Sequence, residues 1–523
     1  MGISYKNLDR TAAFSELEKA APVDLKISLT AERIKSANIS VGGGLTYNYA
    51  AKAVNDDITS ILQKLADEQE LIAKYNELLA GEFMNVGENR KVMHQMTRGE
   101  LAKDVLFEGK NLREFYRAQQ NKIYDFVGKV HGGEIKGSTG KPFDTVCQIG
   151  IGGSDLGPRA LYLAMANYVE PILDAHFISN VDPDDANAVL ERVDLETTLF
   201  ILVSKSGTTQ ETLANKNFVV EMSKKAGIDG FDPSAHLIAV TSETSPLANS
   251  DDVLAAFFMD DFIGGRYSSS SAVGGAVLSL AFGKDVFEEF LSGAHEADKA
   301  ALESDISKNA ALMDAMIGVY ERNVLGYPST AVLPYSQALS RFPAHLQQLD
   351  MESNGKCVNR AGESMNYSTG PVIFGEPGTN GQHSFYQLLH QGTDIVPLQF
   401  IGFKESQIDF DLDYEGSTSQ AKLKANLIAQ IVAFAKGASN DNPNKNFPGG
   451  RPSSLIVGEK LTPRALGALL AHFENKVMFQ GFCWNINSFD QEGVQLGKIL
   501  TKQVLGGGEM DEALVALKDM MSI

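Results

Sequence analysis

The chain has 523 residues, of which 66 are acidic and 46 basic, so its formal net charge at pH 7 is −20. A content of 43% hydrophobic and 21% charged residues is ordinary for a folded globular protein. The excess of negative charge disfavours binding to nucleic acids or to anionic membranes. If the ligand carries a phosphate, lysines and arginines close to it must supply the attraction.

Cysteine and histidine spacing predicts neither disulfides nor a metal site. Cys147, Cys357 and Cys483 lie far apart without CxxC spacing, and no histidines have the spacing of metal ligands. The N-terminus lacks the apolar core of a signal peptide, and no apolar run is long enough to span a membrane. We therefore expect a cytoplasmic protein in a reducing compartment.

Residues 1 to about 140 are predicted to be mainly helical, with one amphipathic helix over 57–79. From residue 144, short apolar runs alternate with helical patterns, which is typical of a parallel sheet covered by helices on both faces. The expected strands of the first half are 145–151, 176–179, 198–203, 236–241 and 256–259. Helical stretches over 285–325 precede expected strands at 330–334, 371–375, 395–402 and 454–457. The sequence predicts two α/β units in tandem, with helical segments at both ends.

Residues 204–212, Ser-Lys-Ser-Gly-Thr-Thr-Gln-Glu-Thr, directly follow the strand expected at 198–203. Backbone N–H groups at a helix N-terminus and nearby hydroxyl groups bind anions, and the helix dipole favours negative charge there. Gly207 lets the backbone approach a ligand closely. The segment predicts a site for a phosphate ester; the alternative is a capped helix without a ligand.

A second glycine-rich turn follows the strand expected at 145–151. It departs from a dinucleotide-binding fingerprint at Asp155 and from a P-loop at Pro158. A small sugar or phosphate against Gly153 and Ser154 fits better than a nucleotide, and tight packing of strand on helix is the alternative.

A third turn has the sequence Gly-Gly-Arg-Tyr-Ser-Ser-Ser-Ser. Its Arg266 could stabilise an oxyanion or a phosphate; the alternative is an ordinary surface arginine.

Three further segments carry candidate proton-transfer groups. Gln348 and Glu352 are four residues apart near the expected end of a helix at Gly355, so they share one face and Glu352 is a candidate base. His383 is expected in the first turn of a helix, where the dipole favours the neutral ring. Gln491 and Lys498 are seven apart and are expected on one helix face. For each of these residues, a structural or solvent-exposed role is the alternative.

Taken together, these segments resemble the glucose-6-phosphate isomerase (phosphoglucose isomerase) family. The segments that carry the resemblance are IGIGGSDLGPRAL, VSKSGTTQET, GGRYSSSSAVGG, LDMESNGK, GEPGTNGQHSFYQLLHQG and SFDQEGVQLGK. The resemblance implies two tandem sugar-isomerase (SIS) domains, each a mainly parallel sheet between helices in an α/β/α sandwich. It gives a helical extension over 1–110, SIS domains over 111–284 and 285–488, and a C-terminal helical segment over 489–523. It also implies a homodimer with its active site between the subunits, and neither a metal nor an organic cofactor.

The family interconverts glucose 6-phosphate and fructose 6-phosphate by opening the sugar ring and moving a proton through a cis-enediol. By resemblance, Glu352 moves this proton and Arg266 stabilises the enediolate. His383, oriented by Glu211, opens the ring together with Lys498. The residues implied in substrate binding are Ser204, Lys205, Ser206 and Thr209 around the phosphate, Gly153 and Ser154 nearby, and Gln348 and Gln491.

Some positions depart from the family's common pattern. Ser270 and Glu492 stand where tryptophan is usual, Gln495 where glutamate is usual, and Ser206-Gly207 where Thr-Phe is frequent. These changes affect the packing expected around Arg266 and Lys498. Two alternatives stay open: an isomerase acting on mannose 6-phosphate, and a sugar-phosphate sensor without catalysis. The motifs leave no room for a second fused activity.

Overall fold

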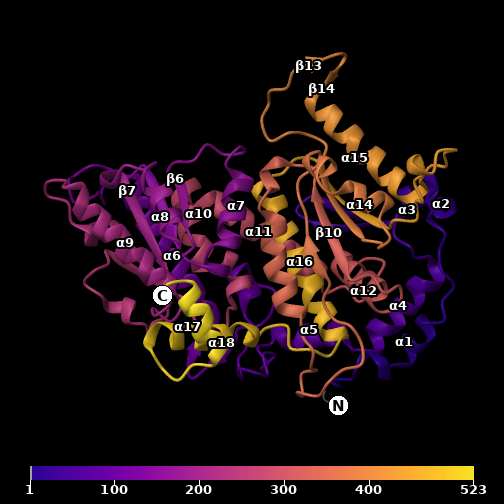
Figure 1. Cartoon of the computed structure of the whole chain (residues 1–523), viewed down its shortest axis with the longest axis horizontal. Helices are drawn as coiled ribbons and strands as arrows, with labels where there is room; N and C mark the ends of the chain where they lie inside the picture. Colours follow the sequence, from indigo (N-terminus) through magenta and orange to yellow (C-terminus); the bar gives the residue numbers. More distant parts are fainter. Residues whose placement is uncertain (1–2) are drawn as a thin grey trace.

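The computed structural model describes residues 3–523 and has two α/β/α halves that lie side by side (Figure 1). Each half is a sheet with helices on both faces, so the predicted architecture is confirmed. The long helices α11 (Lys284–Ala300) and α16 (Pro463–Cys483) pack against each other between the two sheets. The domain boundaries at 110, 284 and 488 stay predictions.

The first half contains a five-stranded parallel sheet in the order β6-β5-β7-β8-β9. Its strands are β5 (Thr145–Ile149), β6 (Asp174–Ile178), β7 (Thr198–Val203), β8 (Leu237–Thr241) and β9 (Ala255–Phe258). Its helices are α6 (Leu112–His131), α7 (Leu156–Met165), α8 (Pro183–Leu190), α9 (Gln210–Ala226) and α10 (Ala272–Phe282). All five strands lie within a few residues of the predicted runs.

The central strand β7 shows why these runs are mainly apolar. All six of its side chains are buried. Leu199 and Ile201 belong to the core that includes α6 and α10, whereas Phe200 and Leu202 belong to the core shared with α8 and α9. Because successive side chains point to opposite faces, a strand covered on both faces is mainly apolar. The one polar side chain of β7, Thr198 at its start, donates its hydroxyl to the Asp194 carbonyl at 2.6 Å.

The second half contains a six-stranded sheet in the order β1-β2-β15-β12-β10-β11. The four parallel strands are β10 (Ser329–Pro334), β11 (Val372–Phe374), β12 (Leu398–Phe403) and β15 (Ser453–Gly458). The helices around it include α12 (Ala310–Asn323), α13 (Phe342–Leu346), α14 (Tyr386–Gln391) and α15 (Ser419–Lys436). These strands were also predicted from the sequence.

The N-terminal segment is mainly helical, as predicted, but it also contains strands. It contains the helices α1 (Ala12–Leu17), α2 (Leu25–Ser28), α3 (Ala31–Ser36), α4 (Asp56–Glu68) and α5 (Leu71–Leu79). It also supplies β1 (Asn38–Gly42) and β2 (Leu45–Asn48), and β2 pairs antiparallel with β15. The helix predicted over 57–79 is broken, because Glu70 has a left-handed backbone with φ of 51°.

One hairpin of the second half and the two C-terminal helices are strongly exposed. The hairpin of β13 (Asp413–Tyr414) and β14 (Ser417–Thr418) projects from the top of the molecule in Figure 1. The C-terminal helices α17 (Gln495–Gly506) and α18 (Glu512–Met520), yellow in Figure 1, have no buried residue. Within residues 3–523, no helix combines the length and apolar character needed to cross a membrane.

A buried ionic cluster joins the N-terminal segment to α11 and α16. Arg98 donates to both carboxylate oxygens of Asp298 at 3.1 Å and to Glu474, and its side chain is fully buried. Its Nε donates to the hydroxyl of Ser270 at 3.1 Å. Ser270, where the sequence departs from the family's usual tryptophan, thus supplies an acceptor that this arginine needs. A buried charge is tolerated only with such partners.

We expect Arg98→Met to lower the free energy of unfolding by about 3–5 kcal/mol, because two buried carboxylates lose their cation. A lower denaturant midpoint would be the readout. As a control, Arg117→Met removes the exposed pair with Glu100 and should leave the denaturant midpoint nearly unchanged, because exposed ion pairs contribute little to stability. An Arg98→Met midpoint no lower than that of the control would contradict the cluster's role.

The pH dependence of this defect has a defined sign. Burial raises the pKa of Glu474 to about 7, even beside Arg98. The folded state therefore binds more protons than the unfolded state between pH values of about 4.5 and 7, and folding gains stability as the pH falls through that window. Arg98 lowers the pKa of Glu474 and Asp298, so the variant without it gains more stability from their protonation than the wild type does. The Arg98→Met defect should therefore be smaller at about pH 5 than at about pH 8.

Candidate active site

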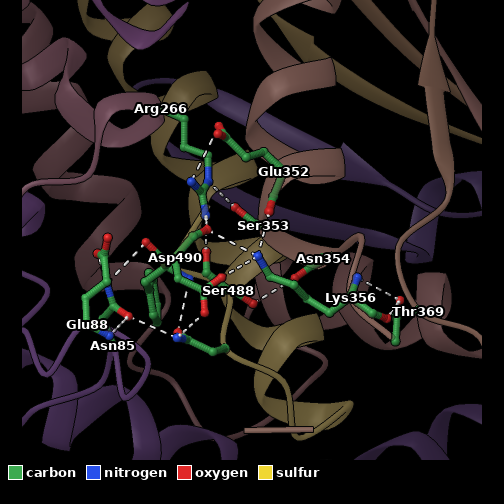
Figure 2. Close-up of polar contacts among 12 residues, drawn as sticks. Asn85, Glu88, Arg266, Glu352, Ser353, Asn354, Lys356, Thr369, Ser488 and Asp490 are labelled. Carbon is green, nitrogen blue, oxygen red and sulfur yellow. Dashed lines mark hydrogen bonds and ion pairs between the residues drawn. The ribbon is translucent and has the colours of Figure 1, made fainter. Parts of the chain in front are cut away.

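Arg266 lies in the 3₁₀ turn that follows β9, and it is only 2% exposed. Its Nε donates to Ser353 Oγ at 2.6 Å, and its Nη2 donates to the carbonyl oxygens of Ser488 at 2.7 Å and Asp490 at 3.0 Å. Figure 2 shows these contacts converging on the guanidinium group. They leave Nη1 facing the Glu352 carboxylate, with Nη1 and Oε2 3.5 Å apart. The arginine is thus held in one orientation toward the candidate base.

Glu352 ends a π-helical turn, Gln347–Glu352, that continues α13. Among the described residues, neither Glu352 Oε2 nor Gln348 Oε1 has a hydrogen-bond partner, although both atoms are buried. Both residues line one pocket, as the shared-face prediction requires, and the helix ends just before Gly355 as predicted. Glu352 Oε2 lies next to Arg266 Nη1, but Gln348 Oε1 has no hydrogen-bond partner in the described part of the chain. Buried polar atoms are normally satisfied, so this amide oxygen indicates a place for a polar ligand.

Gln491 lines this pocket and also a neighbouring one that contains Lys205 and Arg266. The neighbouring pocket is lined by two further cations, Arg90 and Lys91. The structure therefore brings Gln348, Glu352 and Gln491 to one pocket, and Lys205, Arg266 and Gln491 to the next. Two carboxylates, Glu88 and Asp261, line the second pocket as well and both pair with Arg90. The four cations still exceed them by two on a chain of net charge −20, which favours an anionic ligand.

The predicted phosphate loop lies between β7 and α9. The Ser204 and Thr209 hydroxyl groups are 2.8 Å apart, and Thr208 Oγ1 donates to Ser206 Oγ at 2.9 Å. Gly207 has φ of 66°, and a Cβ there would lie 2.1 Å from Ser245 Oγ. A glycine is therefore required at this position.

Lys205 extends from this loop toward the segment before Arg266. Its Nζ donates to the carbonyl of Ile263 at 2.7 Å and lies 4.0 Å from Asp261. Burial lowers the pKa of Lys205, and Asp261 partly opposes this shift. The lysine thus connects the phosphate loop with the turn that carries Arg266.

The turn after β5 packs directly on the arginine turn. A Cβ at Gly153 would lie 2.1 Å from the carbonyl carbon of Gly265. Tight packing therefore explains this glycine, and contact of Gly153 or Ser154 with a substrate stays a prediction. The Asp155 carboxylate forms an ion pair with Arg159, four residues later, with Oδ1 and Nη2 2.7 Å apart.

The structure does not bring the ring-opening candidates to Glu352. His383 and Lys498 are exposed, and Glu211 is half-buried in the first turn of α9. Within residues 3–523, no hydrogen bond or ion pair joins His383 to Glu352 or Glu211. These three roles stay predictions.

Two local predictions are wrong. His383 ends a 3₁₀ turn, Asn380–His383, instead of starting a helix, because Phe385 has a non-helical φ of −125° and α14 begins only at Tyr386. Gln491 has φ of −147° and precedes a 3₁₀ turn, whereas Lys498 lies on α17, so the two do not share a helix face.

Sequence reasoning missed several residues that hold the site. Ser353 and Lys356 lie inside the LDMESNGK segment and Asp490 lies beside Gln491, so their closeness to candidate residues was an available signal. Ser488 contributes a backbone carbonyl, which no side-chain pattern can reveal. Among residues 3–523, no group of three or more His, Cys, Asp or Glu side chains is arranged to hold a metal ion.

Comparisons with known proteins agree with the resemblance. The family model described as phosphoglucose isomerase matches residues 48–518. A glucose-6-phosphate isomerase of Treponema denticola is 61% identical over 528 residues, which cover 99% of this chain and 100% of that protein. One from Borreliella burgdorferi is 50% identical, over 98% of each chain. A crystal structure of a glucose-6-phosphate isomerase from Chlamydia trachomatis superposes with a TM-score of 0.92 at 43% identity, over 99% of both chains. The chain therefore belongs to the phosphoglucose isomerase family.

Proposed function

We propose that this chain interconverts glucose 6-phosphate and fructose 6-phosphate, as a reversible aldose–ketose isomerase of glycolysis and gluconeogenesis. The observation that carries the proposal is the Glu352 carboxylate, which faces a pocket and lies 3.5 Å from the buried Arg266 guanidinium. The curated relatives that match over nearly the whole chain bear the name of this reaction.

In this proposal, Glu352 removes the C2 proton of the open-chain aldose and returns it to C1. A positioned carboxylate is a competent general base, and Glu352 lines the pocket in which the sugar would lie. Removal of the proton places negative charge on the enediolate oxygens. Arg266 stabilises that charge, since its guanidinium is oriented in advance and needs no reorganisation during the reaction. Gln348 and Gln491 orient the sugar hydroxyl groups.

The phosphate group binds to the loop before α9. Ser204, Ser206 and Thr209 offer hydroxyl groups there, and the helix N-terminus offers backbone N–H groups. Lys205 adds positive charge next to the pocket that contains Arg266. Gly153 and Ser154 contribute the neighbouring turn. The first half would then hold the phosphate group and the second half the carbons that exchange the proton, so the open-chain substrate would extend across both halves.

We further propose that the chain works as a cytoplasmic homodimer and that His383 acts in the active site of the partner subunit, with Glu211 orienting it and Lys498 assisting at the ring oxygen. His383 is exposed in the single chain, and no contact within residues 3–523 joins it to Glu352. The exposed apolar surface of the projecting segment 404–418 supports contact with a second copy of the chain. Its exposed apolar side chains are Ile408 (51%), Phe410 (67%), Leu412 (64%) and Tyr414 (69%). Burying one such side chain contributes about 1.5–3 kcal/mol.

We expect Glu352→Gln to fold normally and to lose about 10²–10⁴-fold in kcat, because positioned proton transfer contributes that much. A coupled assay with fructose 6-phosphate measures turnover, and parallel runs with glucose 6-phosphate and mannose 6-phosphate test the substrate range. Glu221→Gln, an exposed glutamate on α9, is the matched control and should keep wild-type turnover. Near-normal kcat in Glu352→Gln would refute the assignment of the base.

Mixed dimers test whether the active site is shared. Equal amounts of Glu352→Gln and His383→Ala chains, refolded together, should recover about one quarter of wild-type activity. The reason is that half of the dimers are mixed, and each mixed dimer has one intact site and one site with both defects.

A second mixture serves as the control. Glu352→Gln mixed with Arg266→Ala should recover nothing, because both residues act in the site of their own chain. If the first mixture also stays inactive, His383 does not act across subunits, and that part of the proposal fails.

A further inference from the structure

Lys356 occupies a central place beside the site, although no role in the reaction has been assigned to it. It lies four residues after Glu352 in the sequence, and its side chain is 16% exposed. Its Nζ donates to Asp490 Oδ1 at 2.6 Å, to the Glu352 carbonyl at 3.0 Å and to the Asp490 carbonyl at 3.2 Å. An ammonium group has three N–H donors, so all of them have acceptors. A fully satisfied ammonium group fixes the relative position of its three acceptors.

Asp490 is held equally firmly. Its second carboxylate oxygen accepts from Asn487 Nδ2 at 2.6 Å, and Asn487 in turn donates to Asn85 at 2.9 Å. Its carbonyl oxygen accepts from both Lys356 and Arg266 Nη2. Figure 2 shows Asp490 between these two cations. The carboxylate balances two neighbouring positive charges that would otherwise repel each other.

These contacts connect three parts of the proposed mechanism. Through Lys356, the Glu352 backbone is joined to Asp490, and through the Asp490 carbonyl both are joined to Arg266. Gln491, the next residue, lines both pockets. The segment after it leads to α17, which carries Lys498. The phosphate loop at 204–209 belongs to the other half and takes no part in these contacts.

We propose that Lys356 and Asp490 are positioning residues, whose ion pair fixes Glu352, Arg266 and Gln491 relative to one another for proton transfer. This inference rests on the proposed role of Glu352 as the base. The pair acts on the geometry of the reacting groups and not on binding of the phosphate. Its loss should therefore lower kcat and leave KM largely unchanged, because misplacement of reacting groups by about 1 Å can cost about 10²-fold in rate.

The test uses Lys356→Met, which keeps an unbranched side chain but removes the ammonium group, Asp490→Asn, which keeps the shape, and the double variant. We expect each single variant to lose about 10–10²-fold in kcat, with KM for fructose 6-phosphate changed less than about threefold. The double variant should be about as slow as the slower single variant, since both changes remove the same interaction. Trypsin cleavage at Lys498 or Lys502 should also become faster in all three variants. Thermal midpoints monitor folding.

Lys216→Met is the matched control. Lys216 forms a pair with Asp252 at 2.8 Å and is 14% exposed, but it lies on α9 away from Glu352. It should keep wild-type kcat. Wild-type kcat in both Lys356→Met and Asp490→Asn, a rise in KM alone, or additive losses in the double variant would each overturn the proposal. If Lys356→Met does not fold, Asp490→Asn and its thermal midpoint decide.

Glu352→Gln, assayed in parallel, separates this inference from the proposed function. If Glu352→Gln is inactive while the Lys356 and Asp490 variants are normal, the base assignment stands and the positioning role fails. If Glu352→Gln is active, the proposed base itself is wrong, whatever the other variants do.

Discussion

The burial of the Arg266 guanidinium is the constraint on which the rest of the site depends. A buried cation needs acceptors for its donors, because an unpaired buried charge costs several kcal/mol. The acceptors belong to Ser353, Ser488 and Asp490, which lie 87, 222 and 224 positions after Arg266 in the sequence. Arg266 can therefore be satisfied only when the first half, the helix of Glu352 and the segment at 488–490 have come together. The contacts that complete the site around Arg266 therefore form only when these parts of the chain fold together.

The same constraint explains the arrangement of the two halves. The first half provides the loop at 204–209 and the turn that carries Arg266, and the second half provides Glu352. Gly153 allows two turns of the first half to touch, and this contact fixes where the arginine leaves the backbone. Each half is a stable α/β/α layer structure that can keep its own loops rigid. Chemistry at the junction then depends on a few polar contacts and not on the cores.

Local charge at the junction runs against the charge of the whole molecule. The formal net charge is −20, yet Arg90, Lys91, Lys205 and Arg266 line one pocket. At physiological ionic strength, charges more than about 8 Å away are largely screened. The nearby cations thus determine the attraction felt by a phosphorylated ligand, and the distant acidic surface has little influence on it.

The sequence by itself determined the two α/β units, nine of the strands and the family. Strands such as β7 are apolar at nearly every position, and the loops that follow them carry unusual clusters of glycine, hydroxyl and charged residues. The short strands β1 and β2 were not predicted: they pair with each other, and their place in the sheet depends on the pairing of β2 with β15, about 400 positions further along the chain. The placement of Gln491 before α17, and of His383 before α14, was also decided by the folded backbone.

Only the tertiary structure determined what holds Arg266 and Glu352 in place. Ser488 and Asp490 bind the arginine through backbone carbonyl oxygens, which every residue possesses, so no sequence pattern marks them. Lys356 was visible within a recognised segment, but its three acceptors become apparent only when distant segments meet. The sequence specifies which functional groups the chain carries, whereas the positions of these groups depend on long-range contacts that form only in the folded chain.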